Sequence, residues 1–192
     1  GLLAATPLTL SLASNIPYLT FALRLDPLAA FFVVTISLVG LATSVYAYGY
    51  VREFVGRISI GLLGSLLNGF LLVVLADNGF FFLILWEVMS LLSYVLVVTE
   101  HEKPGVREAG LFYLIMTHVG TAFIILTFLL FSQETGSFSF EAFRHPDQRL
   151  PEGLRSVAFF TALIGFGAKA GIVPLHVWLP YAHPAAPSHI SA

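Results

Sequence analysis

The sequence contains no cysteine, and only 10% of its 192 residues are charged. The absence of cysteine excludes disulfide frameworks, thiolate zinc sites and thiol redox chemistry, because each requires a sulfur atom that this chain lacks. A soluble domain carries roughly a quarter charged residues, so these few charges cannot cover a water-facing surface of this size. With 57% apolar residues, the chain is expected in a lipid bilayer. The net charge of −2 implies no nucleic-acid partner.

Motifs for bound cofactors are absent from the sequence as well. It has no phosphate-cradling glycine loop, no serine nucleophile motif and no cluster of metal ligands. His176, His183 and His189 stand among prolines at spacings that match no helical metal pair, and we interpret them as loop or cap residues. We therefore expect no metal, no cofactor and no catalytic centre in this chain.

Long uncharged runs predict an all-α polytopic membrane protein with about five transmembrane helices. Each run approaches the ~20 residues needed to cross ~30 Å of hydrocarbon. Three of them are interrupted by a single ionisable residue, which is Glu87, His118 or Lys169. The transmembrane domain is expected over residues 26–192, with spans at about 27–51, 58–76, 79–99, 109–132 and 156–179.

Residues 1–25 differ from the rest, because Pro7 and Pro17 divide them into short pieces in which leucine alternates with other residues. Alternation of this kind has the period of a strand and predicts a short extramembrane hairpin. A kinked partial span is the competing interpretation. Asp26 before Pro27, and Asp77 with Asn78, have the residue types that cap the helices after them.

Basic residues predict the orientation of the chain in the membrane. Arg52 with Arg57, and Lys103 with Arg107, lie in two short loops on one side, which the positive-inside rule places in the cytoplasm. The stretch 134–155 is predicted as a longer loop on the opposite side. The expected location is the inner (cytoplasmic) membrane, crossed several times.

Glu87 and His118 are each predicted close to the middle of the membrane. Both lie nine residues into their spans, which is roughly 13 Å at 1.5 Å per residue. The spans run antiparallel, so the two depths match. A buried glutamate can serve proton transfer or hold helices together as a protonated hydrogen-bonding group, and a buried histidine can relay protons or only satisfy a neighbour. Tyr113, Thr117 and Thr121 give the histidine span a polar stripe that lipid would not tolerate.

Lys169 lies among small residues shortly before Gly171 and Pro174. Proline at position 174 removes a helical amide donor, so the helix is predicted to break one turn after the lysine. A broken helix at membrane depth is tolerated where it lines a cavity, and desolvation there would let a lysine exchange protons. The alternative is a lysine near a helix end that extends to the membrane surface.

Three segments resemble one known superfamily. ADNGFFFLILWEVMSLLSYVLV, residues 76–97, is similar to the glutamate-bearing helix of the antiporter-like subunits of respiratory complex I. GAKAGIVPLHVWLPYAHPAAPSHISA, residues 167–192, resembles the broken lysine helix of the same proton-translocating proteins, and the stretch around His118 resembles the helix between them. The histidine-rich ending is most similar to the branch of hydrogenase-4 component B and formate hydrogenlyase subunit 3, with Mrp antiporter subunits as close relatives.

The resemblance implies roles for individual residues. It assigns Glu87 as the paired glutamate, Lys169 as the lysine that it modulates, His118 as the bridging basic residue, and Pro174 with Gly171 as the helix break. Thr121 stands where some relatives have a carboxylate, so an acidic assist there is in doubt. The family fold has about fourteen helices with inverted five-helix repeats, and we expect this chain to be an incomplete piece of it.

The implied function is the proton-translocating membrane subunit of a redox-driven complex of the hydrogenase-4, formate hydrogenlyase or NADH:quinone oxidoreductase type. Its partners would be the lipid bilayer, other membrane subunits and a peripheral iron-sulfur, nickel-iron or NADH-oxidising arm. Two alternatives remain open at this point: an Mrp-type sodium/proton antiporter subunit, and a membrane scaffold that transports nothing.

Overall fold

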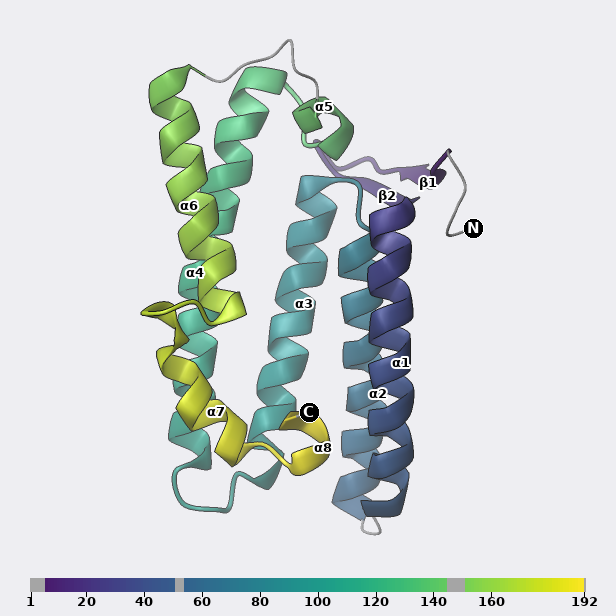
Figure 1. The fold of residues 1–192 in the computed structure, drawn as a ribbon, viewed down its shortest axis with the longest axis vertical. Helices are drawn as coiled ribbons and strands as arrows, with labels where there is room; N and C mark the ends of the chain where they lie inside the picture. The colour runs from purple at the N-terminus through teal and green to yellow at the C-terminus, as the bar shows by residue number, and fades with distance from the viewer. Residues whose placement is uncertain (1–5, 51–53, 145–150, 192) are drawn as a thin grey trace.

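The computed structural model describes residues 6–50, 54–144 and 151–191. Five long helices form an elongated bundle, and shorter helical segments connect or follow them (Figure 1). The long helices are α1 (Pro27–Tyr50), α2 (Phe54–Leu75), α3 (Gly79–Val97), α4 (Val106–Thr135) and α6 (Glu152–Ala170). The short segments are η1 (Val98–Glu100), α5 (Phe140–Arg144), η2 (Leu175–Trp178), α7 (Leu179–Ala185) and α8 (Ser188–Ser191).

The helices have the length and composition that a membrane requires. Four helical stretches of the described chain are long and apolar enough to cross a bilayer, and a shorter apolar helix lies within α2, at Ile60–Leu75. The prediction of an all-α polytopic protein with about five spans is therefore confirmed. The four stretches are Pro27–Gly49, Gly79–Glu100, Val106–Thr135 and Glu152–Ala185.

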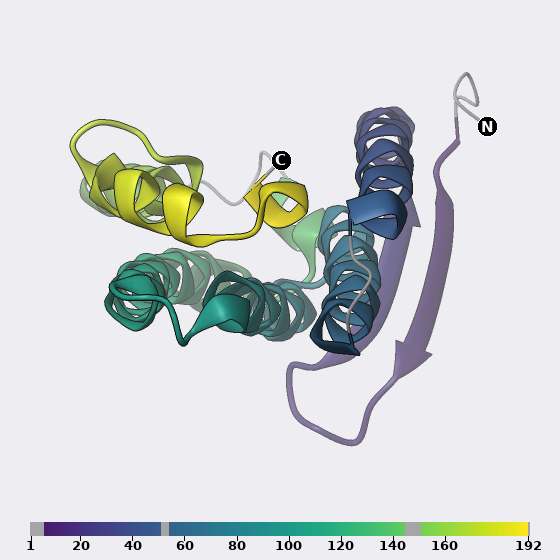
Figure 2. The ribbon, with the colours of Figure 1, turned by 90° about the horizontal axis from the view of Figure 1, so that it is seen from below.

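Neighbouring helices pack in an open chain of contacts, from α1 to α2, α3, α4 and finally α6. Seen along the bundle, α1 and α2 stand on one side, and α4 and α6 on the other, with the C-terminal segments beside them (Figure 2). The α3–α4 connection lies at the same end of the bundle as the last turn of α1 and the first turn of α2 (Figure 1). This is the end predicted to be cytoplasmic. Arg52 lies outside the described residues, and the orientation stays a prediction.

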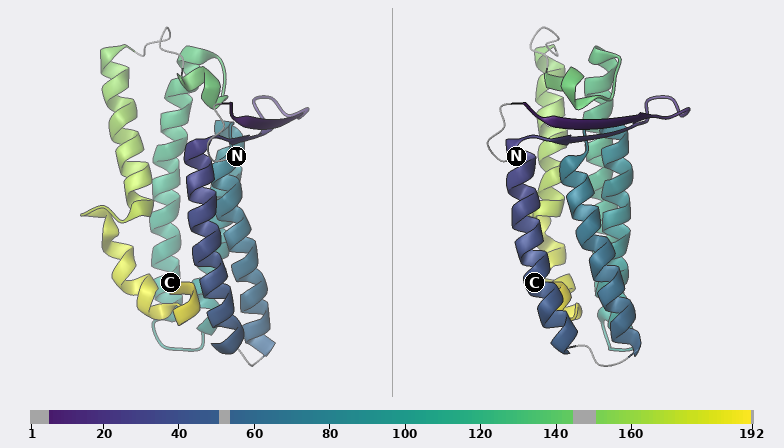
Figure 3. Two further views of the ribbon diagram at one scale, coloured as in Figure 1. Left: turned by 45° about the vertical axis from the view of Figure 1, so that its right-hand side comes forward. Right: turned by 90° about the vertical axis from the view of Figure 1, so that its right-hand side faces the viewer.

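The N-terminal residues form the predicted hairpin. Strands β1 (Leu8–Ala13) and β2 (Thr20–Leu25) pair antiparallel, with Leu8 opposite Leu25. The hairpin lies across one end of the bundle rather than along it (Figure 3), so it does not form the kinked partial span that was its alternative. It is joined to the α2–α3 turn by the amide of Asp77, which donates to the carbonyl of Ala22. Its position outside the membrane, and the division of the chain into 1–25 and 26–192, remain predictions.

Two helix starts have the caps that the sequence predicted. The Asp26 carboxylate accepts a hydrogen bond from the Ala29 amide at 2.9 Å, and the Asn78 side chain accepts one from the Phe81 amide at 2.9 Å. Each satisfies an amide that has no partner within its own helix. Asp77 was grouped with Asn78 as a cap, but its carboxylate contacts arginines instead.

Asp77 belongs to an ion cluster, formed with Arg24, Glu141 and Arg144, that joins the hairpin to α5. Arg24 donates to Glu141 at 2.6 Å, and Arg144 lies 3.5 Å from Asp77. The hydrogen bond from Arg24 lowers the pKa of the Glu141 carboxyl below its ordinary value. Burial raises the pKa of the Asp77 carboxyl, although both arginines act in the opposite direction. The cluster therefore connects three segments that are distant in sequence: β2, the α2–α3 turn and α5.

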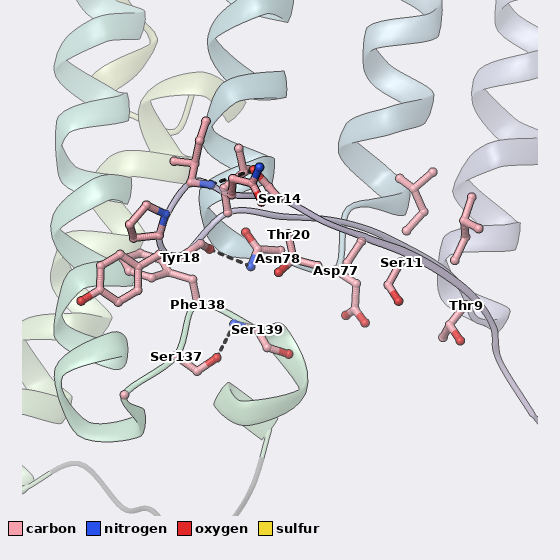
Figure 4. A pocket seen from close by; sticks show the side chains of 18 residues that line it. Thr9, Ser11, Ser14, Tyr18, Thr20, Asp77, Asn78, Ser137, Phe138 and Ser139 are labelled. Atoms are coloured by element: carbon pink, nitrogen blue, oxygen red, sulfur yellow. Dashed lines mark hydrogen bonds between the residues drawn. The ribbon is translucent and has the colours of Figure 1, made fainter.

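A polar pocket of about 720 Å³ lies between the hairpin and residues 136–139 (Figure 4). At its edge the Asn78 side-chain amide donates to the carbonyl of Tyr18 at 3.3 Å, and the Ser139 amide donates to Ser137 at 3.0 Å. Hydroxyl groups of both segments line it. Its polarity contrasts with the apolar helices and agrees with a position at the membrane surface.

The segment predicted as a loop at 134–155 is partly helical. α4 continues to Thr135 and ends at Gly136, whose backbone adopts a left-handed conformation, and α5 forms after it. Ser139 begins α5 by accepting from the Glu141 amide, and rings of Phe140 and Phe143 pack against α4. α6 begins at Glu152, so helices occupy both described ends of this stretch.

Candidate functional site

Glu87 of α3 and His118 of α4 contact each other. The Glu87 Oε2 lies 3.2 Å from the His118 Nε2, which agrees with the equal depths predicted from sequence. His118 Nδ1 lies 2.9 Å from the carbonyl of Leu114; a carbonyl only accepts, so Nδ1 carries the hydrogen. A hydrogen bond across this contact therefore requires one proton, either on Nε2 or on the carboxylate. The other oxygen of Glu87, Oε1, is buried with no hydrogen-bond partner among the described residues.

Lys169, near the end of α6, extends toward both α3 and α4. Its Nζ donates to the Tyr113 hydroxyl of α4 at 2.8 Å and to the Ser90 hydroxyl of α3 at 3.3 Å. The ammonium also lies 5.1 Å from the centre of the Tyr113 ring and 6.0 Å from that of Trp86. The lysine is therefore placed between three helices by neutral groups, and does not extend to the membrane surface.

Glu87 and Lys169, which the resemblance assigns as a functional pair, do not contact each other directly in the structure. Glu87 is paired with His118, and no ion pair of Lys169 occurs among the described residues. Ser90, which contacts the lysine, is fully buried and follows Glu87 by three residues on the same helix. Three residues correspond to a rise of roughly 4.5 Å. The lysine thus contacts the helix of the glutamate about one turn away from it.

The close approach of α4 and α6 brings Lys169 to Tyr113. A Cβ atom at Gly165 would lie 2.9 Å from the carbonyl oxygen of Gly120, a separation that only glycine allows. Away from this crossing, Thr127 of α4 donates to Thr161 of α6 at 2.9 Å, a buried bond between the two helices. The two glycines therefore set the distance between the helices that carry the lysine and its tyrosine partner.

The helix break occurs at Gly171, earlier than the one turn after the lysine that Pro174 predicted. Gly171 has a left-handed backbone with φ of 74°, and the amide of Ile172 bonds to Gly167 rather than to Ala168. The freed carbonyl of Ala168 accepts a hydrogen bond from the Trp178 indole at 2.8 Å. The glycine ends the helix through its own conformation, and the proline only prevents its continuation.

The polar stripe of α4 is buried, as its composition predicted. Tyr113, Thr117 and Thr121 are each at most 4% exposed. The sequence predicted this stripe, but it did not predict that Tyr113 would bind Lys169. Nor did it predict that the Trp178 indole would donate to the free carbonyl of Ala168 at the helix break. The signal for the tyrosine was available, because an aromatic hydroxyl in a buried stripe requires a hydrogen-bond partner.

The C-terminal histidines were predicted as loop or cap residues, but their backbone is mostly helical. His176 lies in η2 and His183 in α7, where its Nδ1 is 2.9 Å from the Ser191 hydroxyl. The side chain of His189 lies outside the described residues. No group of three possible metal ligands occurs within the described ranges 6–50, 54–144 and 151–191.

Comparison with known proteins identifies the family. Residues 76–192 match the family described as NADH:quinone oxidoreductase/Mrp antiporter, TM, which is more than half of the chain. Hydrogenase-4 component B of Escherichia coli (strain K12) is 42% identical over 193 residues, which cover 98% of this chain and 28% of that protein. NADH-quinone oxidoreductase subunit L of Mycobacterium tuberculosis (strain CDC 1551 / Oshkosh) is 31% identical over 83% of this chain and 25% of that protein.

A solved structure supports the same assignment of fold. The Mrp complex from Dietzia sp. DQ12-45-1b contains a chain that superposes with a TM-score of 0.83 at 22% identity, covering 96% of this chain and 20% of that one. The present chain therefore spans about a quarter of the length of the relatives that it matches. Its apolar helices, its broken lysine helix and these similarities agree: this chain belongs to the NADH:quinone oxidoreductase/Mrp antiporter transmembrane family of antiporter-like membrane subunits.

Proposed function

We propose that this chain is part of a proton-translocating membrane subunit of a redox-driven complex, of the hydrogenase-4, formate hydrogenlyase or NADH:quinone oxidoreductase type. One observation carries the proposal: neutral hydroxyl groups of α3 and α4 bind the Lys169 ammonium, about one turn along α3 from the contact between Glu87 and His118. Ionisable groups are costly within a membrane and occur there mainly along ion and proton pathways. The identity with hydrogenase-4 component B, 42%, exceeds the 31% with NADH-quinone oxidoreductase subunit L. Among the three types of complex, sequence identity therefore favours the hydrogenase-4 type.

In this mechanism, the charge of the Glu87–His118 pair controls the proton on Lys169. When the pair loses the proton of its hydrogen bond it becomes negative, and the lysine ammonium is favoured. When the pair regains a proton, that attraction is lost and the lysine releases its own proton to neighbouring water. A redox or ion-binding event elsewhere in the complex must supply the energy, because the three residues alone shift no equilibrium.

The relatives suggest the partners. They are named as a hydrogenase component, a subunit of NADH-quinone oxidoreductase and a member of an Mrp complex, which supports further membrane subunits around this chain. The peripheral arm that oxidises hydrogen, formate or NADH, and the location in the cytoplasmic membrane, belong to the proposal. So does the complete fold of about fourteen helices.

The test is proton translocation by the complex that contains the full-length protein, reconstituted in lipid vesicles. We expect Lys169→Ala and Glu87→Gln each to abolish translocation or uncouple it from electron transfer, while the complex still assembles. His118→Ala should cause a partial loss, because the carboxylate remains. Lys103→Ala and Glu134→Gln are matched controls, since both side chains are exposed, Lys103 in the α3–α4 connection and Glu134 near the end of α4.

Each alternative predicts a different result. Normal translocation by Lys169→Ala would refute the proposal, and normal transport by the Glu87→Gln, Lys169→Ala double variant would favour a scaffold. Proton movement driven by a sodium gradient, without copurifying iron-sulfur or nickel-iron subunits, would indicate an antiporter of the Mrp type instead.

A further inference from the structure

Lys169 also borders a cavity of about 510 Å³ on the side that faces α1 and α2. The cavity lies between these helices, α3, and the C-terminal segment of α7 and α8. Apolar side chains form most of its wall. Its polar groups include Ser93, Tyr113, Lys169, His183 and Ser191.

His183 connects this cavity with the surface of the chain. Its side chain lines the cavity and is exposed, whereas Tyr113 in the same wall is buried. The imidazole stacks on the Trp178 ring with an interplanar angle of 17°, and its Nδ1 lies 2.9 Å from the Ser191 hydroxyl. Both contacts orient the ring. α7 carries it away from the helix break toward the end of the bundle with the α3–α4 connection (Figure 1).

The ionisable groups in the described wall of the cavity are Lys169 of α6, Tyr113 of α4 and His183 of α7. The described wall contains no carboxylate. Of these three, His183 has the side chain suited to relay a proton, because one nitrogen of an imidazole can accept a proton while the other donates one.

We propose that His183 is the residue through which Lys169 exchanges protons with water at the α3–α4 end of the bundle. This inference rests on the function proposed above. A proton leaves the Lys169 ammonium for water in the cavity and reaches one nitrogen of the His183 imidazole. The imidazolium releases the proton of its other nitrogen to bulk water, so the amine is left neutral and the histidine returns to its starting charge.

The cavity has the space that this route requires. One water needs roughly 10–15 Å³ and two to four polar partners, so the volume holds a file of several molecules. Hydroxyl groups of Ser93, Tyr113 and Ser191 provide partners along the wall. The rest of the wall is apolar. In this proposal, His183 is therefore the residue of the wall that passes the proton to bulk water.

The test uses the complex with the full-length protein in vesicles, and His183→Ala as the variant. A positioned acid-base group contributes roughly 10²–10⁴-fold; because cavity water retains part of the path, we expect translocation to slow by about tenfold or more. External imidazole, at millimolar concentration, should restore the rate. His183→Gln, which preserves the size of the side chain, should behave in the same way if the alanine variant assembles poorly. His101→Ala is the matched control, since this exposed histidine lies in the α3–α4 connection and does not line the cavity.

The outcomes separate this inference from the function on which it rests. Loss of translocation in Lys169→Ala with a normal rate in the His183 variants would overturn the role of His183 alone. Slow His183 variants that imidazole does not restore would also overturn it, because a structural role predicts that result. Normal translocation by Lys169→Ala would refute the proposed function itself.

Discussion

Replacing Gly165 by alanine tests whether the close approach of α4 and α6 positions Lys169. The new Cβ would lie 2.7 Å from Cγ1 of Ile124 and 2.9 Å from the carbonyl oxygen of Gly120. An ordinary contact begins at 3.4 Å, so the backbone approach must open by about 0.5 Å. The atoms of Gly120 belong to a helix backbone and cannot rotate away. Overpacking of this kind costs roughly 1–3 kcal/mol.

The same movement reaches the lysine. Lys169 follows Gly165 by one helical turn, and its hydrogen bond to Tyr113 crosses from α6 to α4 at 2.8 Å. A separation of about 0.5 Å would bring that distance to the outer limit of roughly 3.2 Å for a normal hydrogen bond, or beyond it. We therefore expect Gly165→Ala to lower both the melting temperature and the rate of proton translocation.

Gly153→Ala is the matched control, because it makes the same change in the same helix. A Cβ at position 153 meets no atom within 4 Å, and alanine favours a helix over glycine by about 0.5–1 kcal/mol. The assays are thermal melting of the purified full-length protein in detergent and translocation in vesicles. If Gly165→Ala melts no lower than Gly153→Ala and transports normally, the glycine crossing does not hold the lysine in place.

Two further predictions concern the end of the bundle at the hairpin. Asn78→Ala should lower the melting temperature, because it removes both the cap of α3, which contributes about 1 kcal/mol, and the hydrogen bond to the Tyr18 carbonyl; Asn78→Asp keeps the cap acceptor but loses the donor to Tyr18, and should melt between Asn78→Ala and the native protein. The pKa of Glu141 is lowered by Arg24, so its ionised form stabilises the native state above the ordinary value of 4.5, and this contribution is lost as pH falls through the lowered pKa. The difference in melting temperature between the native protein and Glu141→Gln should thus be present above pH 4.5 and disappear in stronger acid; a difference that is unchanged at low pH would contradict the role of the Arg24 contact.

The spans and the depth of the ionisable residues within them could be predicted from the sequence, because both follow from simple lengths. Uncharged runs fix where helices cross a membrane, and the rise per residue places Glu87 and His118 at one height. The structure brings these two side chains to 3.2 Å. The caps of α1 and α3 were equally predictable, since a cap depends on residues within one turn of the chain.

The partners of Lys169 could not be predicted in this way. They depend on the rotation of α3 and α4 about their axes and on the close approach at Gly120 and Gly165, which no local pattern specifies. The helix break, by contrast, was assigned to Gly171 and Pro174 together, and α6 ends at the left-handed Gly171. The short helix α5 was missed because its stability comes from rings that pack on a distant part of α4.

Glu87 and Lys169 form no direct bond with each other. This arrangement suits the proposed proton transfer better than a direct ion pair between the two residues would. A buried ion pair stabilises the ammonium strongly, and breaking one by removing a partner costs roughly 3–5 kcal/mol. The hydroxyl groups of Ser90 and Tyr113 accept from an ammonium and, after rotation, donate to a neutral amine. Lys169 therefore keeps hydrogen-bond partners both as an ammonium and as a neutral amine. In the proposed function, the charge of the Glu87–His118 pair shifts the balance between these two states without fixing the proton on the lysine.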